Sequence, residues 1–222
     1  MSASVRTLKG VGEKRAGLLG RLSLYTLRDF LRYFPRDYED RSAFYTIADA
    51  PEGQSCCIRA VVGSEPTTAV VRRGLSIGKV HVFDETGALA LTFYNRPYLK
   101  SQLHIGGEYI FFGRVETFGR TKRMQNPQFE PAERAGGTTG RILPVYPLTD
   151  GVTRPMIMQG AAAALKAADG RFDDPIPPAI ARENGLCDVG FAYQNVHFPA
   201  DWDAARRARD RFIFEEFFIF SL

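Results

Sequence analysis

The fold is decided by residues 88–99, which read Ala88-Leu89-Ala90-Leu91-Thr92-Phe93-Tyr94-Asn95-Arg96-Pro97-Tyr98-Leu99. Side chains alternate between the two faces of a strand, so Leu89, Leu91 and Phe93 share one apolar face. Tyr94 falls on the opposite face. Pro97 ends the strand, because proline has no N–H group for the hydrogen-bonded ladder. The stretch therefore predicts a half-buried strand that stops just after an outward-facing tyrosine.

Tyr98 follows four residues after Tyr94, with Arg96 between them. Two aromatic rings beside a cation at a strand end are suited to stacking on unpaired bases. The alternative is that both tyrosines pack beneath a loop and keep only their hydroxyl groups in water. These three residues are the central candidates for nucleic-acid binding.

The region around this strand predicts a small barrel. Five strand-like runs are separated by turn signals: Cys56–Val62, Gly78–Phe83, Ala88–Tyr94, Glu108–Thr117 and Thr121–Phe129. A short helical piece, Tyr98–Leu103, lies between the third run and the fourth. Five strands with a helix after the third predict an OB-fold, whose usual cargo is single-stranded nucleic acid. The predicted class is α+β, with an N-terminal helical region at 1–50, the barrel at 51–135, and a linker with helices at 136–222.

Basic residues cluster in two connections of the predicted barrel. Arg72 and Arg73 lie in its long first loop, and Arg120, Lys122 and Arg123 surround its last hairpin. Residues 54–135 contain eleven Lys and Arg against seven Asp and Glu, which favours a polyanionic partner. Charged hairpin tips also serve solubility, so the pattern supports nucleic-acid binding without requiring it.

The segment Leu8–Leu19 has the pattern of a helix-hairpin-helix. Gly10 and Gly12 flank one apolar residue and precede a helix that begins with Lys14 and Arg15 nearby. Glycine permits a positive φ in the turn, and the free N–H groups of the new helix are able to receive a phosphate. The alternative is that the hairpin only packs its two helices together.

Further helices are expected at Thr26–Phe34, at Pro155–Ala168 and at Trp202–Leu222. The apolar residues of the last helix cover most of its circumference, so it must be buried against a partner. No such partner is obvious within the chain, which we therefore expect to be a fragment.

Several classes of function find no support. No run of about 18 apolar residues predicts a membrane span, and the N-terminus has no apolar signal region. The three cysteines include an adjacent pair and form no Cys-x-x-Cys, so we expect a reduced, cytoplasmic protein without a metal site. Residues 74–80 echo a phosphate loop but are one residue short, with Val80 where Ser or Thr would hold magnesium. We expect no catalytic residue and no cofactor in this chain.

Taken in order, these features resemble the N-terminal wedge region of RecG-type branch-migrating DNA helicases along essentially the whole chain. Spaced matches in the same order carry the resemblance: Leu8–Leu19, Phe34–Arg41, Phe93–Leu99, Met124–Glu130, Pro144–Pro147, His197–Pro199 and Arg206–Phe217. The resemblance implies an OB wedge beside a helical bundle, joined to an ATP- and magnesium-dependent motor that would follow Leu222.

In that family, two aromatic side chains four residues apart stack on bases at the branch point of a fork or Holliday junction. The pattern falls on Tyr94 and Tyr98, although the family usually has phenylalanine at the first position and glutamine where this chain has Arg96. The implied partners are branched DNA and the motor of the whole protein. Two other functions stay open: a sequence-tolerant single-strand-binding module of another nucleic-acid enzyme, and a protein-interaction module that uses the Phe-rich C-terminal helix.

Overall fold

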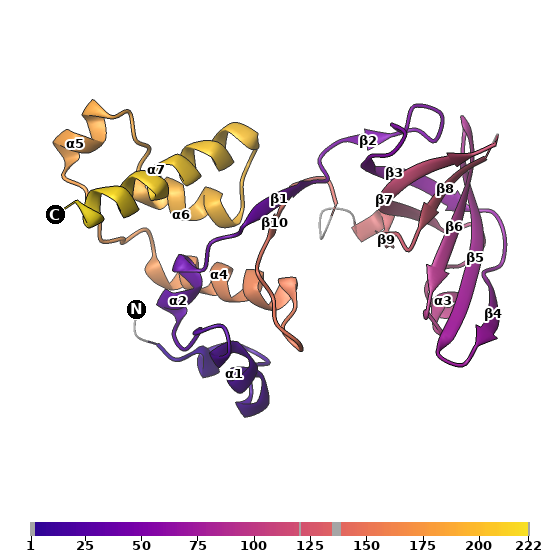
Figure 1. Ribbon diagram of the computed structural model, residues 1–222, viewed down its shortest axis with the longest axis horizontal. Coiled ribbons are helices and arrows are strands. Elements are labelled where there is room, and N and C mark those ends of the chain that lie inside the picture. Colours follow the sequence, from indigo (N-terminus) through magenta and orange to yellow (C-terminus); the bar gives the residue numbers. More distant parts are fainter. Residues whose placement is uncertain (1–2, 120, 135–138, 222) are drawn as a thin grey trace. The chain divides into compact units, whose positions relative to one another are not determined.

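The computed structural model describes residues 3–119, 121–134 and 139–221, which form two compact units (Figure 1). The barrel unit spans Asp40–Arg141, and the helical unit combines the chain up to Glu39 with the chain from Ile142 onward. The sequence predicts separate regions for the two ends of the chain, at 1–50 and 136–222. In the structure they belong to one unit, because apolar residues from both ends share a core.

The barrel unit confirms the predicted OB-type architecture. Its strands are β2 (Phe44–Tyr45), β3 (Ser55–Val62), β4 (Thr67–Arg72), β5 (Leu75–Asp84), β6 (Gly87–Tyr94), β7 (Glu108–Phe118), β8 (Thr121–Gln125) and β9 (Gln128–Pro131). The path β3-β5-β6-β8-β7 closes into a barrel because β3 also pairs with β7. The short helix α3 (Leu99–Gln102) lies between β6 and β7, as expected. Leu89, Leu91 and Phe93 are buried in the barrel core, which confirms the alternation read from the sequence.

Two parts of the barrel differ from the expectation. Part of the expected long first loop is strand β4, which forms a hairpin with β5. The expected run Thr121–Phe129 is split into β8 and β9, because Asn126 adopts a φ of +48° and the next residue, Pro127, lacks an N–H group. After this bend β8 pairs with β6 and the outer end of β7, whereas β9 pairs with the other end of β7.

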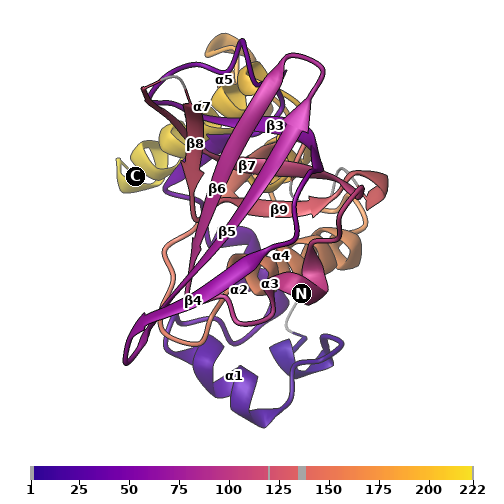
Figure 2. The same ribbon diagram turned by 90° about the vertical axis from the view of Figure 1, so that its right-hand side faces the viewer.

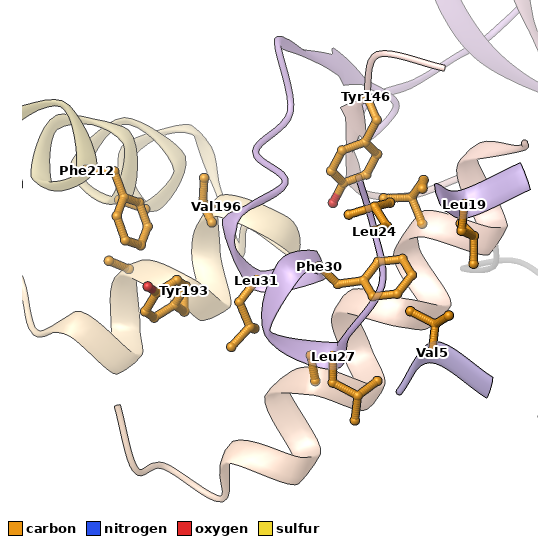
Figure 3. Packing of buried hydrophobic residues seen from close by; sticks show 14 of the residues in the cluster. Val5, Leu19, Leu24, Leu27, Phe30, Leu31, Tyr146, Tyr193, Val196 and Phe212 are labelled. Carbon is orange, nitrogen blue, oxygen red and sulfur yellow. The ribbon is translucent and has the colours of Figure 1, made fainter. Parts of the chain in front are cut away.

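The helical unit is built from one 3-10 turn, a two-stranded sheet and six α-helices among its described residues. These are the turn Val5–Thr7, α1 (Glu13–Gly20), α2 (Leu27–Arg32), β1 (Asp37–Asp40), β10 (Ile142–Val145), α4 (Arg154–Ala168), α5 (Pro178–Glu183), α6 (Val189–His197) and α7 (Trp202–Phe220). Figure 3 shows Phe30 and Leu31 of α2 at the centre of its core, between side chains from both ends of the chain. Before the glycine hairpin, the helical unit has only the 3-10 turn Val5–Thr7 in place of a helix.

The last helix, α7, is only partly covered. Its Phe212 is buried in the helical core. Ile213, Phe217, Ile219 and Phe220 are exposed large apolar side chains toward its C-terminal end. The apolar residues of α7 thus lie on several sides of the helix, as predicted, and only part of them is buried within the described residues.

Candidate nucleic-acid interface

Tyr94 stands on the outer face of the barrel, at the end of β6. Its side chain is 38% exposed, whereas the preceding Phe93 is fully buried. The next residue, Asn95, turns the chain with a φ of +52°, a conformation that asparagine tolerates better than most residues. Asn95 is fixed to β5 by two hydrogen bonds with Ser76, one from each backbone N–H, both 2.9 Å long. The backbone that presents Tyr94 is therefore pinned to the sheet.

Tyr98 lies just before α3, and its ring is 74% exposed. The neighbouring Leu99 is fully buried in the barrel core and packs on Gly78 of β5, where any Cβ would meet its methyl group at 2.8 Å. Ser101 donates to the Tyr98 carbonyl oxygen from both its N–H (3.2 Å) and its hydroxyl (2.9 Å). The ring thus projects into solvent from a backbone that is held on both sides. An exposed ring on an anchored backbone excludes the alternative that Tyr98 packs beneath a loop.

The hydroxyl group of Tyr94 has a partner of its own. It donates to Oε1 of Gln125 on β8 at 3.1 Å, and Nε2 of Gln125 donates to Oε2 of Glu116 on β7 at 3.2 Å. This chain of contacts orients the Tyr94 ring along the outer surface of β8. A phenylalanine would lack the first of these bonds.

Three of the predicted basic residues gather at the same end of the barrel as the tyrosines. Arg96 lies between the two rings in sequence, and its side chain is exposed. Arg72 ends β4 and Arg73 begins the β4–β5 turn, just beyond the point where Ile77 of β5 pairs with Tyr94. The structure therefore brings Arg72, Arg73, Arg96, Tyr94 and Tyr98 to one end of the barrel.

Lys122 and Arg123 lie farther along the barrel, toward its opposite end. Lys122 donates to the carbonyl oxygens of Ala48 (2.6 Å) and Ala50 (3.0 Å), so its ammonium group fastens a loop to the barrel. Arg123 pairs with Glu116 at 3.4 Å. Arg120 lies outside the described residues. Lys122 and Arg123 pair with Leu89 and Ala90 of β6, five and four positions before Tyr94, which corresponds to about 13–17 Å of strand.

The glycine hairpin belongs to the helical unit. Gly10 has a φ of +82°, which favours glycine, and Gly12 caps α1 without a side-chain hydrogen bond. Arg15 donates to the Gly10 carbonyl oxygen at 2.8 Å, so its guanidinium group braces the turn, whereas the Lys14 side chain is exposed. A phosphate contact by Gly10, Gly12, Lys14 and Arg15 stays a prediction.

Sequence reasoning missed the outward residues on either side of β6. Lys79 and His81 of β5 are exposed and stand beside Thr92 and Ala90. Phe118, at the end of β7, is 71% exposed and was not among the predicted site residues. The alternation of β5 was a usable signal for Lys79 and His81. The exposure of Phe118 depends on how β7 pairs with β8, and no pattern in the sequence shows the register of that pairing.

The described residues include no cluster of metal-ligating side chains, and residues 74–80 do not form a phosphate loop. No three His, Cys, Asp or Glu side chains within them lie together as a metal would require. The stretch that echoes a phosphate loop, Gly74–Val80, runs into strand β5, and Gly78 faces the Leu99 side chain. It forms no strand-to-helix loop around a phosphate, so its residues do not fit ATP. None of the helices in the part of the chain that the structure describes is long and apolar enough to cross a membrane.

Comparisons of the chain with known protein families, sequences and solved structures agree with one another. A family model described as "RecG wedge domain" matches residues 4–164. The chain is 29% identical to the ATP-dependent DNA helicase RecG of Thermotoga maritima and 31% identical to that of a Synechocystis strain, over 100% and 97% of its length. It spans 28% of each of these relatives. A solved structure of RecG bound to a three-way DNA junction matches 99% of the chain and 30% of that protein, with a TM-score of 0.81 and 28% identity.

Proposed function

Because the chain belongs to the RecG wedge domain family, we propose that it is the branched-DNA-binding wedge of an ATP-dependent DNA helicase. Its partner is a replication fork or Holliday junction with single-stranded character, and the whole protein acts in recombination and repair. The relative solved with a three-way junction, which matches nearly the whole chain, supports this proposal.

The observation that carries the proposal is the pair of tyrosines on an anchored backbone. At a branch point, bases that leave the duplex lose the stacking of their neighbours. The exposed ring of Tyr98 and the half-exposed ring of Tyr94 offer replacement surfaces, each worth about 1–3 kcal/mol per stacked base. Arg72, Arg73 and Arg96 lie at the same end and supply positive charge for the phosphates that accompany these bases.

In this proposal, unwinding is carried out by a motor in the rest of the whole protein. The named relatives are ATP-dependent helicases of which this chain spans about three tenths. In this proposal ATP and magnesium bind to that motor, and the wedge alone needs no cofactor. The relatives' activity on DNA also supports a cytoplasmic location, with the protein on the nucleoid when it is bound to DNA.

The test compares the affinity of the chain for a three-way junction, for a single strand and for a duplex of the same total length. We expect the junction to bind most tightly, and the affinity to fall steeply with salt because phosphate contacts release counterions. Tyr98→Ala should weaken junction binding at least about fivefold, as the loss of about 1 kcal/mol of stacking requires. Phe220→Ala, which removes an exposed ring from α7, is the matched control and should leave affinity unchanged.

The outcomes separate the remaining candidates. Equal affinity for junction and single strand would favour a sequence-tolerant single-strand-binding module. Equal affinity for junction and duplex at every salt concentration would contradict the proposal. A melting temperature unchanged by Tyr98→Ala shows that the loss concerns binding, because a core tyrosine would cost stability instead.

A further inference from the structure

The outer face of the barrel sheet forms a continuous surface along β6. Cross-strand partners point to the same face, so Ala90 stands in one row with His81 of β5 and Arg123 of β8. Thr92 stands in the next row, with Lys79 on one side and Gln125 on the other. The short side chains of Ala90 and Thr92 therefore form a low strip along β6, with longer polar and basic side chains on both sides. We call this strip the floor. Figure 2 views this part of the barrel with β5 and β6 in front and β8 beside β6.

Each end of this floor has an exposed aromatic ring. Tyr94 closes one end, as described above. At the other end stands Phe118, the last residue of β7, which pairs with Thr121 of β8. It lies two residues beyond Glu116, whose side chain contacts outward-facing Arg123, so Phe118 belongs to the same outer face.

Arg123 is held in place over the second ring. Its guanidinium carbon lies 5.0 Å from the centre of the Phe118 ring, and Glu116 fixes the group from the side at 3.4 Å. An arginine in this position contributes in two ways, because its plane stacks on bases and its charge attracts phosphate. Phe118 and Arg123 together present the features that bind a base and its phosphate.

The charge of the surface favours a nucleic-acid strand as its occupant. Lys79 and Arg123 stand on opposite sides of the floor, and Glu116, already paired with Arg123, is the carboxylate in these rows. A polyanion with flat, stackable groups suits a basic surface that ends in aromatic rings. The floor runs six positions along β6, from Tyr94 to Ala88. This is about 20 Å, which matches roughly six nucleotides at the spacing of a stacked strand.

We propose that Phe118 and Arg123 form a second stacking site for DNA, to which the outer face of β6 leads a single strand from Tyr94 and Tyr98. The proposal rests on the proposed function, since it requires that a single-stranded arm leave the branch point at the tyrosines. It adds a length requirement: an arm shorter than about six nucleotides reaches only the first site, and a longer arm reaches both.

The experiment measures junction affinity for a series of three-way junctions that differ only in the length of one single-stranded arm. Wild-type affinity should rise once the arm exceeds about six nucleotides. Phe118→Ala should remove this rise, which means at least about a fivefold loss on arms of about twelve nucleotides and no change on arms of about three. Phe118→Tyr keeps a ring and should restore the rise, and Phe220→Ala should behave as wild type.

Two results would overturn this inference. One is a wild-type affinity that does not depend on arm length, and the other is a Phe118→Ala variant that binds long arms as tightly as wild type does. Tyr98→Ala separates this failure from that of the proposed function, because it should weaken binding to junctions of every arm length. If Tyr98→Ala has no effect on any junction, the proposed function itself fails.

Discussion

His197 should make the helical unit sensitive to mild acid. This side chain, at the end of α6, is fully buried. Its Nε2–H donates to the carbonyl oxygen of Leu31 at 2.9 Å, and its Nδ1 accepts the hydroxyl of Tyr146, also at 2.9 Å. Both bonds are satisfied by the neutral ring. Burial disfavours the charged form and lowers the pKa of His197 from 6.5 to about 4.

The sign and size of the effect follow from this lowered pKa. Between the two pKa values the unfolded chain binds a proton that the folded chain does not, so stability falls as the pH drops below about 6.5. The loss amounts to about 2 kcal/mol between pH 7 and pH 5, and to about 3 kcal/mol once the pH is below 4. Burial raises the pKa of Glu215, which acts in the opposite direction and stabilises the fold as the pH falls.

Urea unfolding of wild type and of His197→Gln at pH 7 and pH 5 isolates the contribution of His197. Glutamine does not titrate here and is able to keep both a donor and an acceptor, so the contribution of Glu215 cancels in the comparison. We expect wild type to lose about 2 kcal/mol more than the variant over this range. His81→Gln, at an exposed position, should lose as much as wild type. Equal losses in wild type and His197→Gln would refute the reasoning.

Three further predictions concern packing and the interface. Gly160→Ala should cost about 1–3 kcal/mol of unfolding free energy, because a Cβ there would lie 2.3 Å from the Phe30 ring, whereas Gly17→Ala, which meets nothing within 4 Å, should be neutral or stabilising. Gly78→Ala should push Leu99 outward and weaken junction binding several-fold while the chain still unfolds cooperatively; unchanged affinity would show that Leu99 does not position Tyr98. The exposed rings of Phe217 and Phe220 should make the wild-type chain self-associate at high concentration, as light scattering would show. Replacing both by Ser should reduce this self-association and leave stability within about 0.5 kcal/mol, whereas a strictly monomeric wild type would contradict the prediction.

The parts of the fold that rest on local alternation were predictable from the sequence. The buried series Leu89, Leu91 and Phe93 and the exposed ring of Tyr94 follow from the two-residue period of a strand. Strand β4 was not predicted, because all of its side chains are exposed and it therefore shows no apolar alternation. Asn126 and Pro127 signal the break between β8 and β9, but Thr121–Phe129 was predicted as one continuous strand.

The candidate site was predictable as a set of residue types but not as a geometry. Lys122 has the same charge as Arg96, yet its ammonium group is held by the carbonyl oxygens of Ala48 and Ala50, more than seventy residues away in the chain. No local pattern reports such a contact. The basic residues are likewise divided between two ends of the barrel by the register of the strands. This register is set by pairing between residues that are far apart in the sequence.

The anchoring of the tyrosines explains why a barrel suits the proposed junction-binding role. Ordering a flexible loop on binding costs about 1–2 kcal/mol per residue, which would cancel much of the stacking energy of two rings. Here the ordering takes place during folding, because Leu99 is part of the barrel core and Asn95 is bonded to β5. In the proposed function the stacking energy is then fully available for binding bases at the junction. Substitutions of residues that hold the backbone of Tyr98, such as Leu99, should accordingly weaken junction binding even though these residues need not touch DNA.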